Sequence, residues 1–584
     1  MKRCMALWAV LGCATQQPPP AFSDASDVTK DSADTAAADT AVDVVPEGGD
    51  GGDLFAPPRQ VSPPNTSVVN TRRPRFRWAL SQGVDGAVVE VCRDRGCNVV
   101  VTRIMATGTS AEPEVDLPPG VLFWRLLARR GSAQGTRRSV PWTFTAVTRN
   151  ARSTTAWGTL LDVNGDGHAD LAVGAPGTEA MTAPAGAVYV YVAADTELPG
   201  LPTFTLRTME PRSARFGASV ASAGDVDGDG FGDLLVGAPG DFEGMNNQGL
   251  VFLYRGAVTG LGELPTAVLR GAARGNGFGQ RVASAGDVNA DGYGDVLVAS
   301  PTAQTVWLYL GGPDGLTEAR SRPLTNVAAT SLFGQSVAGV GDVNGDGYGD
   351  ILVGAPGEGA RRGRVYVYHG AQEGVLPSPL PLTSPDAMDG LYGQSVAGAG
   401  DINGDGFADV ILGAPASGAG RTGRAYLAVG STAGLQGGGL SRIEAPAGAS
   451  NFGAAVAGVG DLNADGTSDV VVGAPGDPSA VGPASAGTAY VFLGSGLGVD
   501  PMPAYAVTAM ADALRTALGA SATMMGDVNN DAYADFALGE PLANDGTGRV
   551  VLLRGAAMTM GFGTLQTLEG RELRSRFGTS LGGW

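Results

Sequence analysis

Histidine, lysine and long apolar runs are scarce in this chain of 584 residues. His168 and His369 are the only histidines, which leaves little room for a zinc site built from histidine ligands. Lys2 and Lys30 are the only lysines among 39 basic residues. A membrane-spanning helix needs about 18–20 apolar residues, and no apolar run in this chain is that long. No G-x-S-x-G sequence, the motif that holds a nucleophilic serine, stands between a strand and a helix.

Glycine and acidic residues, by contrast, are abundant. The chain has 92 glycines and 36 prolines, and its net charge is −19. Such a glycine content approaches that of low-complexity chains, but here the glycines recur periodically. The apolar fraction of 43% is sufficient for a large core. We therefore expect a folded repeat protein, not a disordered chain.

The first 13 residues, MKRCMALWAVLGC, predict a signal peptide, with a basic start and a short apolar segment. The segment Val10–Cys13 resembles the bacterial lipoprotein cleavage box, which implies that Cys13 becomes a lipid-carrying N-terminus. This predicts an exported protein of the cell envelope or outer membrane whose only membrane contact is the N-terminal lipid anchor. The alternative is ordinary secretion, in which Cys13 has no role.

Residues 14–56 form an acidic, low-complexity segment with nine acids and one lysine. It has too few bulky apolar residues to offset the entropy of ordering, so we predict a disordered linker. A specific acidic binding tail is the alternative.

Residues 57–148 predict a small β-sandwich, because short alternating apolar runs are separated by proline, glycine and asparagine turns. The segment loosely resembles fibronectin type III and immunoglobulin domains. Cys92 and Cys97 bracket four residues, so in a hairpin they would face each other and form a disulfide; two free thiols are the alternative. A cluster of four arginines, at positions 72, 73, 75 and 77, is either a binding patch for acidic groups or a solvated basic face.

The remainder contains seven copies of a nine-residue acidic loop, spaced 55–66 residues apart. The copies read DVNGDGHAD, DVDGDGFGD, DVNADGYGD, DVNGDGYGD, DINGDGFAD, DLNADGTSD and DVNNDAYAD. Positions 1, 3, 5 and 9 are always Asp or Asn, and position 6 is glycine except at Ala532 in the seventh loop. Buried-strand sequences follow each loop where an EF-hand would need a helix.

Oxygen donors at this spacing indicate calcium, which takes six to eight oxygens at about 2.3–2.6 Å. We predict about seven structural Ca²⁺ ions, with side chains at positions 1, 3, 5 and 9 and the backbone carbonyl at position 7 as ligands. In the first four loops these residues are Asp162, Asn164, Asp166, His168, Asp170, Asp225, Asp227, Asp229, Phe231, Asp233, Asp287, Asn289, Asp291, Tyr293, Asp295, Asp342, Asn344, Asp346, Tyr348 and Asp350. In the last three they are Asp401, Asn403, Asp405, Phe407, Asp409, Asp461, Asn463, Asp465, Thr467, Asp469, Asp527, Asn529, Asp531, Tyr533 and Asp535. For any single loop the alternative is an acidic turn without metal, and this alternative is strongest for the seventh loop.

Fixed motifs flank each loop: an F-G-x-S-V-A sequence before it and a G-A-P sequence after it, with A-S-P and G-E-P as variants. Four strands in about 60 residues, seven times over, predict a seven-bladed β-propeller over residues 152–584. This order of motifs resembles the FG-GAP repeats of the integrin alpha-subunit propeller and its bacterial relatives. Integrin propellers typically keep calcium loops in only some blades, whereas all seven repeats here have one.

The first repeat lacks the strand that begins with the FG motif, while the chain ends with an extra copy, Phe577-Gly578-Thr579-Ser580. We therefore predict that the C-terminal segment supplies the first strand of the first blade, which removes two exposed sheet edges.

The resemblance implies that the calcium loops lie on one face and that ligands bind the opposite face. We expect a monomeric, calcium-stabilised adhesion or recognition module for a protein or glycan, with no nucleic-acid partner and no catalytic residues. A structural scaffold of the cell envelope is the second hypothesis. A carbohydrate- or lipid-active enzyme is the third, because acids outside the loops leave room for a carboxylate pair.

Overall fold

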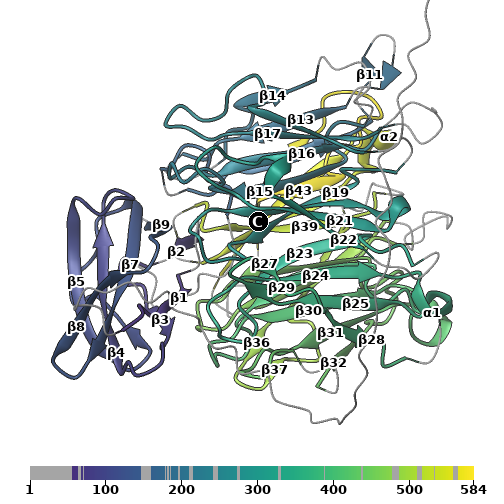
Figure 1. Ribbon diagram of the computed structural model, residues 1–584. Helices are drawn as coiled ribbons and strands as arrows, with labels where there is room; N and C mark the ends of the chain where they lie inside the picture. Colours follow the sequence, from purple (N-terminus) through teal and green to yellow (C-terminus); the bar gives the residue numbers. More distant parts are fainter. Residues whose placement is uncertain are drawn as a thin grey trace, which may run out of the picture. The chain divides into compact units, whose positions relative to one another are not determined.

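The computed structural model describes a β domain near the N-terminus and a β-propeller after it (Figure 1). The described residues are 55–63, 67–69, 71–146, 160–166, 168–177, 179–180, 183–184, 186–194, 198–208, 215–240, 248–272, 276–325, 331–386, 389–435, 439–476, 486–509, 516–529, 531, 533–556 and 563–583. The predicted signal peptide with Cys13, residues 14–54 of the predicted linker, and Ala532 lie outside the described residues.

The N-terminal β domain consists of two sheets that share one core. A three-stranded sheet has the order β1-β3-β6, and a six-stranded sheet has the order β2-β9-β7-β4-β5 with β8 paired to β7. Phe76 and Trp78 from the first sheet pack with Trp124 and Phe144 from the second. The strands are β1 (Arg59–Ser62), β2 (Ser67–Val69), β3 (Phe76–Ala79), β4 (Gly86–Cys92), β5 (Val100–Thr107), β6 (Ser110–Ala111), β7 (Gly120–Arg130), β8 (Ala133–Arg138) and β9 (Trp142–Ala146).

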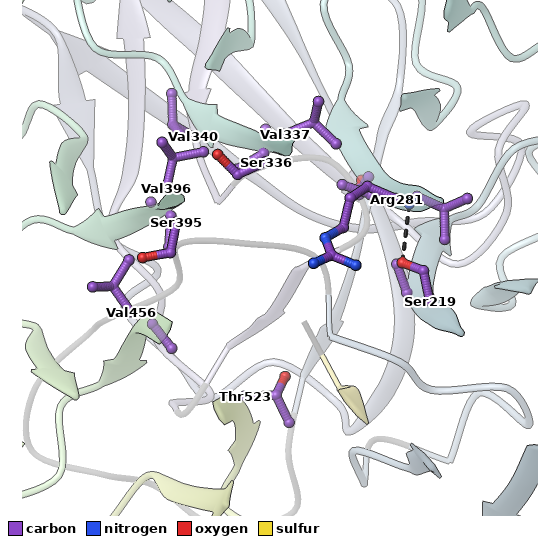
Figure 2. Close-up of a pocket in the computed structure, with 18 of the residues that line it drawn as sticks. Ser219, Arg281, Ser336, Val337, Val340, Ser395, Val396, Val456 and Thr523 are labelled. Carbon is purple, nitrogen blue, oxygen red and sulfur yellow. Dashed lines mark hydrogen bonds between the residues drawn. The ribbon is translucent and has the colours of Figure 1, made fainter. Parts of the chain in front are cut away.

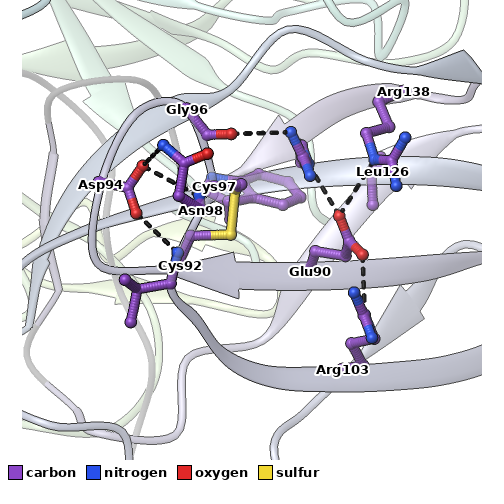
Figure 3. Close-up of a disulfide and its surroundings, with 12 residues drawn as sticks. Glu90, Cys92, Asp94, Gly96, Cys97, Asn98, Arg103, Leu126 and Arg138 are labelled. Carbon is purple, nitrogen blue, oxygen red and sulfur yellow. Dashed lines mark hydrogen bonds and ion pairs between the residues drawn. A yellow bond between two sulfur atoms is a disulfide. The ribbon is translucent and has the colours of Figure 1, made fainter.

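A disulfide joins Cys92 and Cys97 at the end of β4 (Figure 3). The expected cross-strand geometry is wrong in detail, because β5 begins at Val100 and Cys92 pairs with that residue. Cys97 lies in the turn instead, with a φ of 52°. The tight turn brings the two Cα atoms to 5.1 Å, within the range that a disulfide needs.

The propeller has seven four-stranded antiparallel sheets among the described residues, as the repeats predict. The innermost strands are β43 (Ser580–Gly582), β15 (Ser219–Gly224), β19 (Arg281–Gly286), β23 (Ser336–Gly341), β29 (Ser395–Gly400), β33 (Ala455–Gly460) and β39 (Ser521–Gly526). The second strands are β10 (Leu171–Ala175), β16 (Asp233–Ala238), β20 (Asp295–Ser300), β24 (Asp350–Ala355), β30 (Asp409–Ala414), β34 (Asp469–Ala474) and β40 (Asp535–Glu540).

The outer half of each blade is formed by two further strands. The third strands are β13 (Ala187–Tyr191), β17 (Leu250–Tyr254), β21 (Thr305–Tyr309), β25 (Arg364–Tyr368), β31 (Arg424–Ala428), β35 (Thr488–Phe492) and β41 (Arg549–Arg554). The fourth strands are β14 (Phe204–Leu206), β18 (Ala267–Arg270), β22 (Ser321–Thr325), β28 (Leu380–Thr383), β32 (Ser441–Glu444), β38 (Tyr505–Thr508) and β42 (Gly563–Glu569).

Short elements fill some connections. They are β11 (Glu179–Ala180), β12 (Ala183–Pro184), β26 (Gly370–Ala371), β27 (Gly374–Val375), β36 (Gly494–Ser495), β37 (Gly498–Val499), the 3-10 turns Pro301–Ala303, Glu318–Arg320 and Ala419–Arg421, and the helices α1 (Glu358–Arg361) and α2 (Ala543–Gly546). Within the described ranges, no helix has both the length and the apolar character needed to span a membrane.

The C-terminal strand closes the ring of blades. β43 pairs antiparallel with β10 of the first blade, with Leu581 opposite Val173. Each innermost strand contacts the innermost strand of the next blade, and the circle runs from β39 through β43 to β15 (Figure 1). The predicted closure is therefore confirmed, and it leaves the first blade with four strands like the others.

Seven hydrophobic clusters hold the ring together, each between two neighbouring blades. The second strand of every blade is buried along its whole length, which explains its continuous apolar sequence. The cluster that joins the last blade to the first contains Met525 and Leu552 together with Val173 and Leu581.

The FG and G-A-P motifs lie where blades touch. In the fourth blade the backbone N–H of Gly334 donates to the carbonyl of Gly354, 2.9 Å away. A Cβ on Gly354 would stand 2.1 Å from the carbonyl oxygen of Gly393, which belongs to the FG motif of the next blade. The G-A-P glycine is thus required by the close approach of the neighbouring blade.

Candidate metal-binding loops

Six of the seven acidic loops connect the first and second strands of their blades. The loop of the first blade precedes the second strand, β10, because the innermost strand of that blade, β43, comes from the C-terminal segment. In the second to sixth blades, position 1 directly follows the innermost strand and position 9 begins the second strand, as with Asp225 after β15 and Asp233 at the start of β16. Because the blades share one strand order, the loops lie at the same end of the strands and the FG motifs at the other.

The position-1 aspartate organises each loop from within. Its Oδ1 accepts a hydrogen bond from the backbone N–H of position 5 in all seven loops, at 2.9–3.2 Å. In five loops its Oδ2 also accepts from the N–H of position 6, at 2.7–2.9 Å. The position-5 Asp accepts from the N–H of position 7 in every loop, at 2.8–3.1 Å. The backbone thus curls around these carboxylates.

The position-9 aspartate ties each loop to the body of its blade. These residues are almost fully buried, and in every loop Oδ2 accepts from the N–H of position 2 at 2.8–3.0 Å. Oδ1 accepts from a backbone N–H just after the third strand, at 2.7–2.9 Å. The loop pattern predicted only a ligand here. The structure shows that this aspartate also holds the loop to the end of the third strand, about 20 residues further along the chain.

Two loop positions need a left-handed backbone. Position 6 has positive φ in the described loops, for example 98° at Gly230, which explains the glycine found there. Position 4 also has positive φ, at 77° for Gly228 and 55° for Ala290, although glycine is not constant at this position. A Cβ on Gly228 would stand 2.8 Å from the ring of Tyr293, the position-7 residue of the next loop. The side chains at position 7 therefore cover neighbouring loops, a role that the ligand pattern does not reveal.

The second loop differs from the rest in its charge. In the first and third to sixth loops, the position-3 Asn donates its Nδ2 to the position-5 Asp at 2.7–3.0 Å. The second loop has Asp227 there, and carboxylate oxygens of Asp225, Asp227 and Asp229 lie within 4.8 Å of one another. Arg255 lies 2.7 Å from Asp227 and offsets part of this charge. Three converging carboxylates suit a hard cation, so this donor set fits calcium.

Burial raises the pKa of several loop carboxylates at positions 1 and 9. Burial first, and then the charge of Asp229, raises the pKa of Asp225 to about 7. Burial and Asp291 raise the pKa of Asp287 to about 7 in the same way. Burial, and then the charge of Asp225, raises the pKa of the fully buried Asp233 well above its usual value. A bound cation would reverse this effect, because it favours the charged form.

The two histidines both lie at these loops. His168 is at position 7 of the first loop and is buried. His369 follows β25, and its Nδ1 lies 3.3 Å from Oδ1 of Asp350. The close carboxylate of Asp350 outweighs the effect of burial and raises the pKa of His369. The structure thus places His369 against the fourth loop, a contact that the sequence analysis did not predict.

Arginines of the N-terminal β domain contact the same loops. Arg95 donates to the carbonyl of Gly292 at 3.0 Å and lies 4.2 Å from the ring centroid of Tyr293. Arg59 donates to the carbonyl of Asp346. Arg77 donates to the carbonyl of Gly406 at 2.5 Å.

The arginine cluster predicted from the sequence therefore divides its contacts. Arg77 reaches the fifth loop, whereas Arg73 pairs with Asp116 and Arg75 with Glu112 inside the domain. Neither a free binding patch nor a wholly solvated face describes it.

Comparison with known proteins places the chain in a family. The FG-GAP repeat model matches seven times, over residues 155–191, 216–254, 278–309, 333–368, 392–428, 452–492 and 519–553. Integrin alpha-4 of Xenopus laevis is 35% identical over 150 residues, which cover 24% of this chain and 14% of that protein. Integrin alpha-V of Gallus gallus is 36% identical over 161 residues, covering 26% and 15%. Integrin alpha-7 of Rattus norvegicus is 33% identical over 192 residues, covering 31% and 16%.

The closed ring of seven blades, each with an acidic loop, defines the protein as a seven-bladed β-propeller. The seven matches to the FG-GAP repeat model identify its family. The chain belongs to the FG-GAP repeat proteins, with a propeller of the integrin alpha type. It spans only about 15% of the length of the integrin relatives that it matches. The family matches begin at residue 155, so the fibronectin or immunoglobulin likeness of the β domain stays a prediction.

Proposed function

We propose that this protein is a calcium-stabilised binding module, displayed on the cell surface, which recognises a protein or glycan through the propeller face opposite the acidic loops. The observation that carries the proposal is the repetition of one oxygen-lined loop in all seven blades of an integrin alpha-type propeller. The side chains at loop positions 1, 3, 5 and 9 and the carbonyl at position 7 would hold the ions. Bound Ca²⁺ would neutralise carboxylates that otherwise repel one another.

The opposite face suits recognition because it is made of connections with different lengths. Those between second and third strands include α1 in the fourth blade and α2 in the seventh. Glu358 in α1 accepts hydrogen bonds from Arg364 and from the hydroxyl of Tyr366, so this connection is held against its blade. Loops on a rigid scaffold are where binding residues concentrate.

Calcium dependence is tested by melting the full chain in calcium and in chelator, with metal content measured in parallel. Each ion held at 100 times its Kd adds about 2.7 kcal/mol to the free energy of unfolding, so several ions should raise Tm sharply. Asp227→Asn, which gives the second loop the Asn of its neighbours, should weaken one site without unfolding the blade. The exposed Asp314→Asn is the matched control. Equal melting curves with and without chelator would refute structural calcium.

Recognition is tested with the full chain immobilised against glycan arrays, envelope fractions and foreign cell surfaces, in calcium and in chelator. We expect saturable binding to a foreign surface or glycan that disappears in chelator. Binding only to the cell's own envelope fraction would contradict the recognition role and favour the scaffold hypothesis.

A further inference from the structure

A cavity of about 400 Å³ lies along the axis of the propeller, between the innermost strands (Figure 2). Its walls are mostly small or apolar side chains, among them Val337, Val340, Val396 and Val456. It extends from the end of the strands that follows the FG motifs to Asp287 and Asp342 at the loop end.

The first residue of each innermost strand lines the FG end of this cavity. In four blades it is a serine whose hydroxyl donates to the FG glycine carbonyl of the next blade at 2.8–2.9 Å. Ser219 instead accepts from the backbone N–H of Val282 at 3.0 Å, and Ala455 takes the position in the sixth blade. The position therefore normally holds a small residue, most often one that joins two blades.

The third blade breaks this rule with Arg281. Arg281 pairs in register with Ala299, where other blades have the G-A-P glycine. In the fourth blade the hydroxyl oxygen of Ser336 lies 2.2 Å from the point where a Cβ on Gly354 would stand. The methyl group of Ala299 thus occupies the space that a serine hydroxyl would fill. The Arg281 side chain turns instead into the cavity, where its guanidinium points between the strands (Figure 2).

No carboxylate among the described residues forms an ion pair with this guanidinium. Its Nη1 donates to the carbonyl of Gln280 at 3.1 Å, which uses one of five N–H donors. Burial, and then the nearby positive charge of Arg215, lowers the pKa of Arg281. Asp287 follows the far end of the same strand, about 20 Å away at roughly 3.3 Å per residue. Within the described ranges, the positive charge of Arg281 at the FG end of the axis therefore has no carboxylate partner.

From this arrangement we propose that Arg281 anchors a binding site for a carboxylate carried on a short apolar body, inside the central cavity. A guanidinium binds a carboxylate through two parallel N–H donors, and Arg281 is the only arginine among the described residues that line the cavity. The valines around it favour an aliphatic body over a fully hydrated inorganic anion. Arg281 is partly buried, and a charge removed from water without an ion pair carries a desolvation cost, which a bound carboxylate would reduce.

The site is separate from the acidic loops and does not depend on which macromolecule the outer face recognises. It has a sequence signal, because Arg281 is the one large residue at a position that is otherwise serine or alanine. A carboxylate on a partner protein and a free fatty acid share this chemistry. A small aliphatic acid therefore serves as the probe.

The test is calorimetric titration of the full chain, in calcium, with hexanoate, with the neutral hexanamide and with inorganic phosphate. We expect saturable binding of hexanoate only. Arg281→Met keeps the length and removes the charge, and Arg281→Ala reproduces the residue of the sixth blade. Both should weaken hexanoate binding at least tenfold, whereas Arg322→Ser, an exposed arginine on the same blade, should not change it.

A second readout separates ligand binding from a structural role. Without hexanoate, the Arg281→Met protein should melt at or above the wild-type temperature, because it no longer holds a partly buried charge that has no carboxylate partner among the described residues. A clear fall in Tm for both Arg281 variants would overturn the proposal and make Arg281 a structural residue. Unchanged hexanoate binding in Arg281→Met, equal binding of phosphate, or no saturable binding to the wild type would overturn it as well.

Discussion

At the scale of single residues, two buried glutamates form ion pairs with arginines, whereas one partly buried arginine, Arg281, does not pair with a described carboxylate. In the N-terminal β domain, Glu90 is 3% exposed and accepts from Arg103, Arg125 and Arg138 (Figure 3). In the seventh blade, Glu540 of the G-E-P variant pairs with Arg549 on the neighbouring strand, and both are buried. Arg281, which is partly buried, forms no ion pair with a carboxylate within the described part of the chain.

Replacing Glu90 by Gln should destabilise the β domain by about 1–3 kcal/mol, because three arginines lose their shared charge-assisted acceptor. The burial of Glu90 by itself raises its pKa, but the hydrogen bonds from Arg125 and Arg103 outweigh it and the pKa is lowered. A lowered pKa stabilises the fold above the ordinary value of 4.5, and this contribution is lost as the pH falls through the folded-state pKa. The advantage of the wild type over Glu90→Gln should therefore be full at neutral pH and disappear in acid.

The measurement is thermal unfolding followed by tryptophan fluorescence, which reports on Trp78 and Trp124 in the domain core. Glu112→Gln, which breaks an exposed pair with Arg75, is the matched control and should change stability little. A Glu90→Gln protein as stable as this control at pH 7 would contradict the assigned role.

At the scale of elements, the residues of the repeat motif lie mainly at the junctions between neighbouring blades. In the fifth blade, the ring of Tyr392 in the FG position packs edge-on against Tyr426 of the third strand, 5.4 Å between centroids. Its backbone forms a bridge to Gly363 of the preceding blade. The G-A-P glycines and the serines after the FG motif complete the same junction. The motif is conserved from repeat to repeat because each copy must fit the next one.

Replacing Gly354 by Ala tests this junction. The new methyl group would stand 2.1 Å from the carbonyl oxygen of Gly393 and 2.2 Å from the hydroxyl of Ser336, so the blades must shift. We expect a loss of about 1–3 kcal/mol, typical of overpacking. Gly496→Ala is the matched control, since a Cβ there meets nothing within 4 Å. The measurement is the midpoint of denaturant unfolding for both variants. Equal midpoints would show that the junction tolerates a side chain at Gly354.

At the scale of the whole molecule, stability depends on joining the two ends of the repeat array. Residues from β43 and from the first blade share one cluster with the seventh blade. If that junction opens, two sheet edges and the apolar surface between two blades meet water. The seven blades should therefore unfold as one cooperative unit.

Replacing Leu581 by Asp should lower the free energy of unfolding of the entire propeller by about 3 kcal/mol or more, since it buries an unpaired charge in the closing strand. Leu581 is 8% exposed, whereas Leu573 in the same segment is 80% exposed, so Leu573→Asp is the control. Deleting residues 571–584 should have the larger effect. Calorimetry of the full chain measures both, and an unchanged Tm after the deletion would refute closure by the C-terminal strand.

The sequence by itself determined the repeat, the four strands of each blade, the acidic loops and the closure by the C-terminal strand. These features follow from the local spacing of the motifs. Because that spacing recurs seven times, it is not a coincidence. Only the tertiary structure decided what the motifs touch: the position-9 carboxylates on a later strand, the position-7 rings on the neighbouring loop, and Arg59, Arg77 and Arg95 on loop carbonyls. It also turned Arg281 into the central cavity. Such contacts join residues far apart in the chain, and no local pattern records which side chains the closed ring brings together.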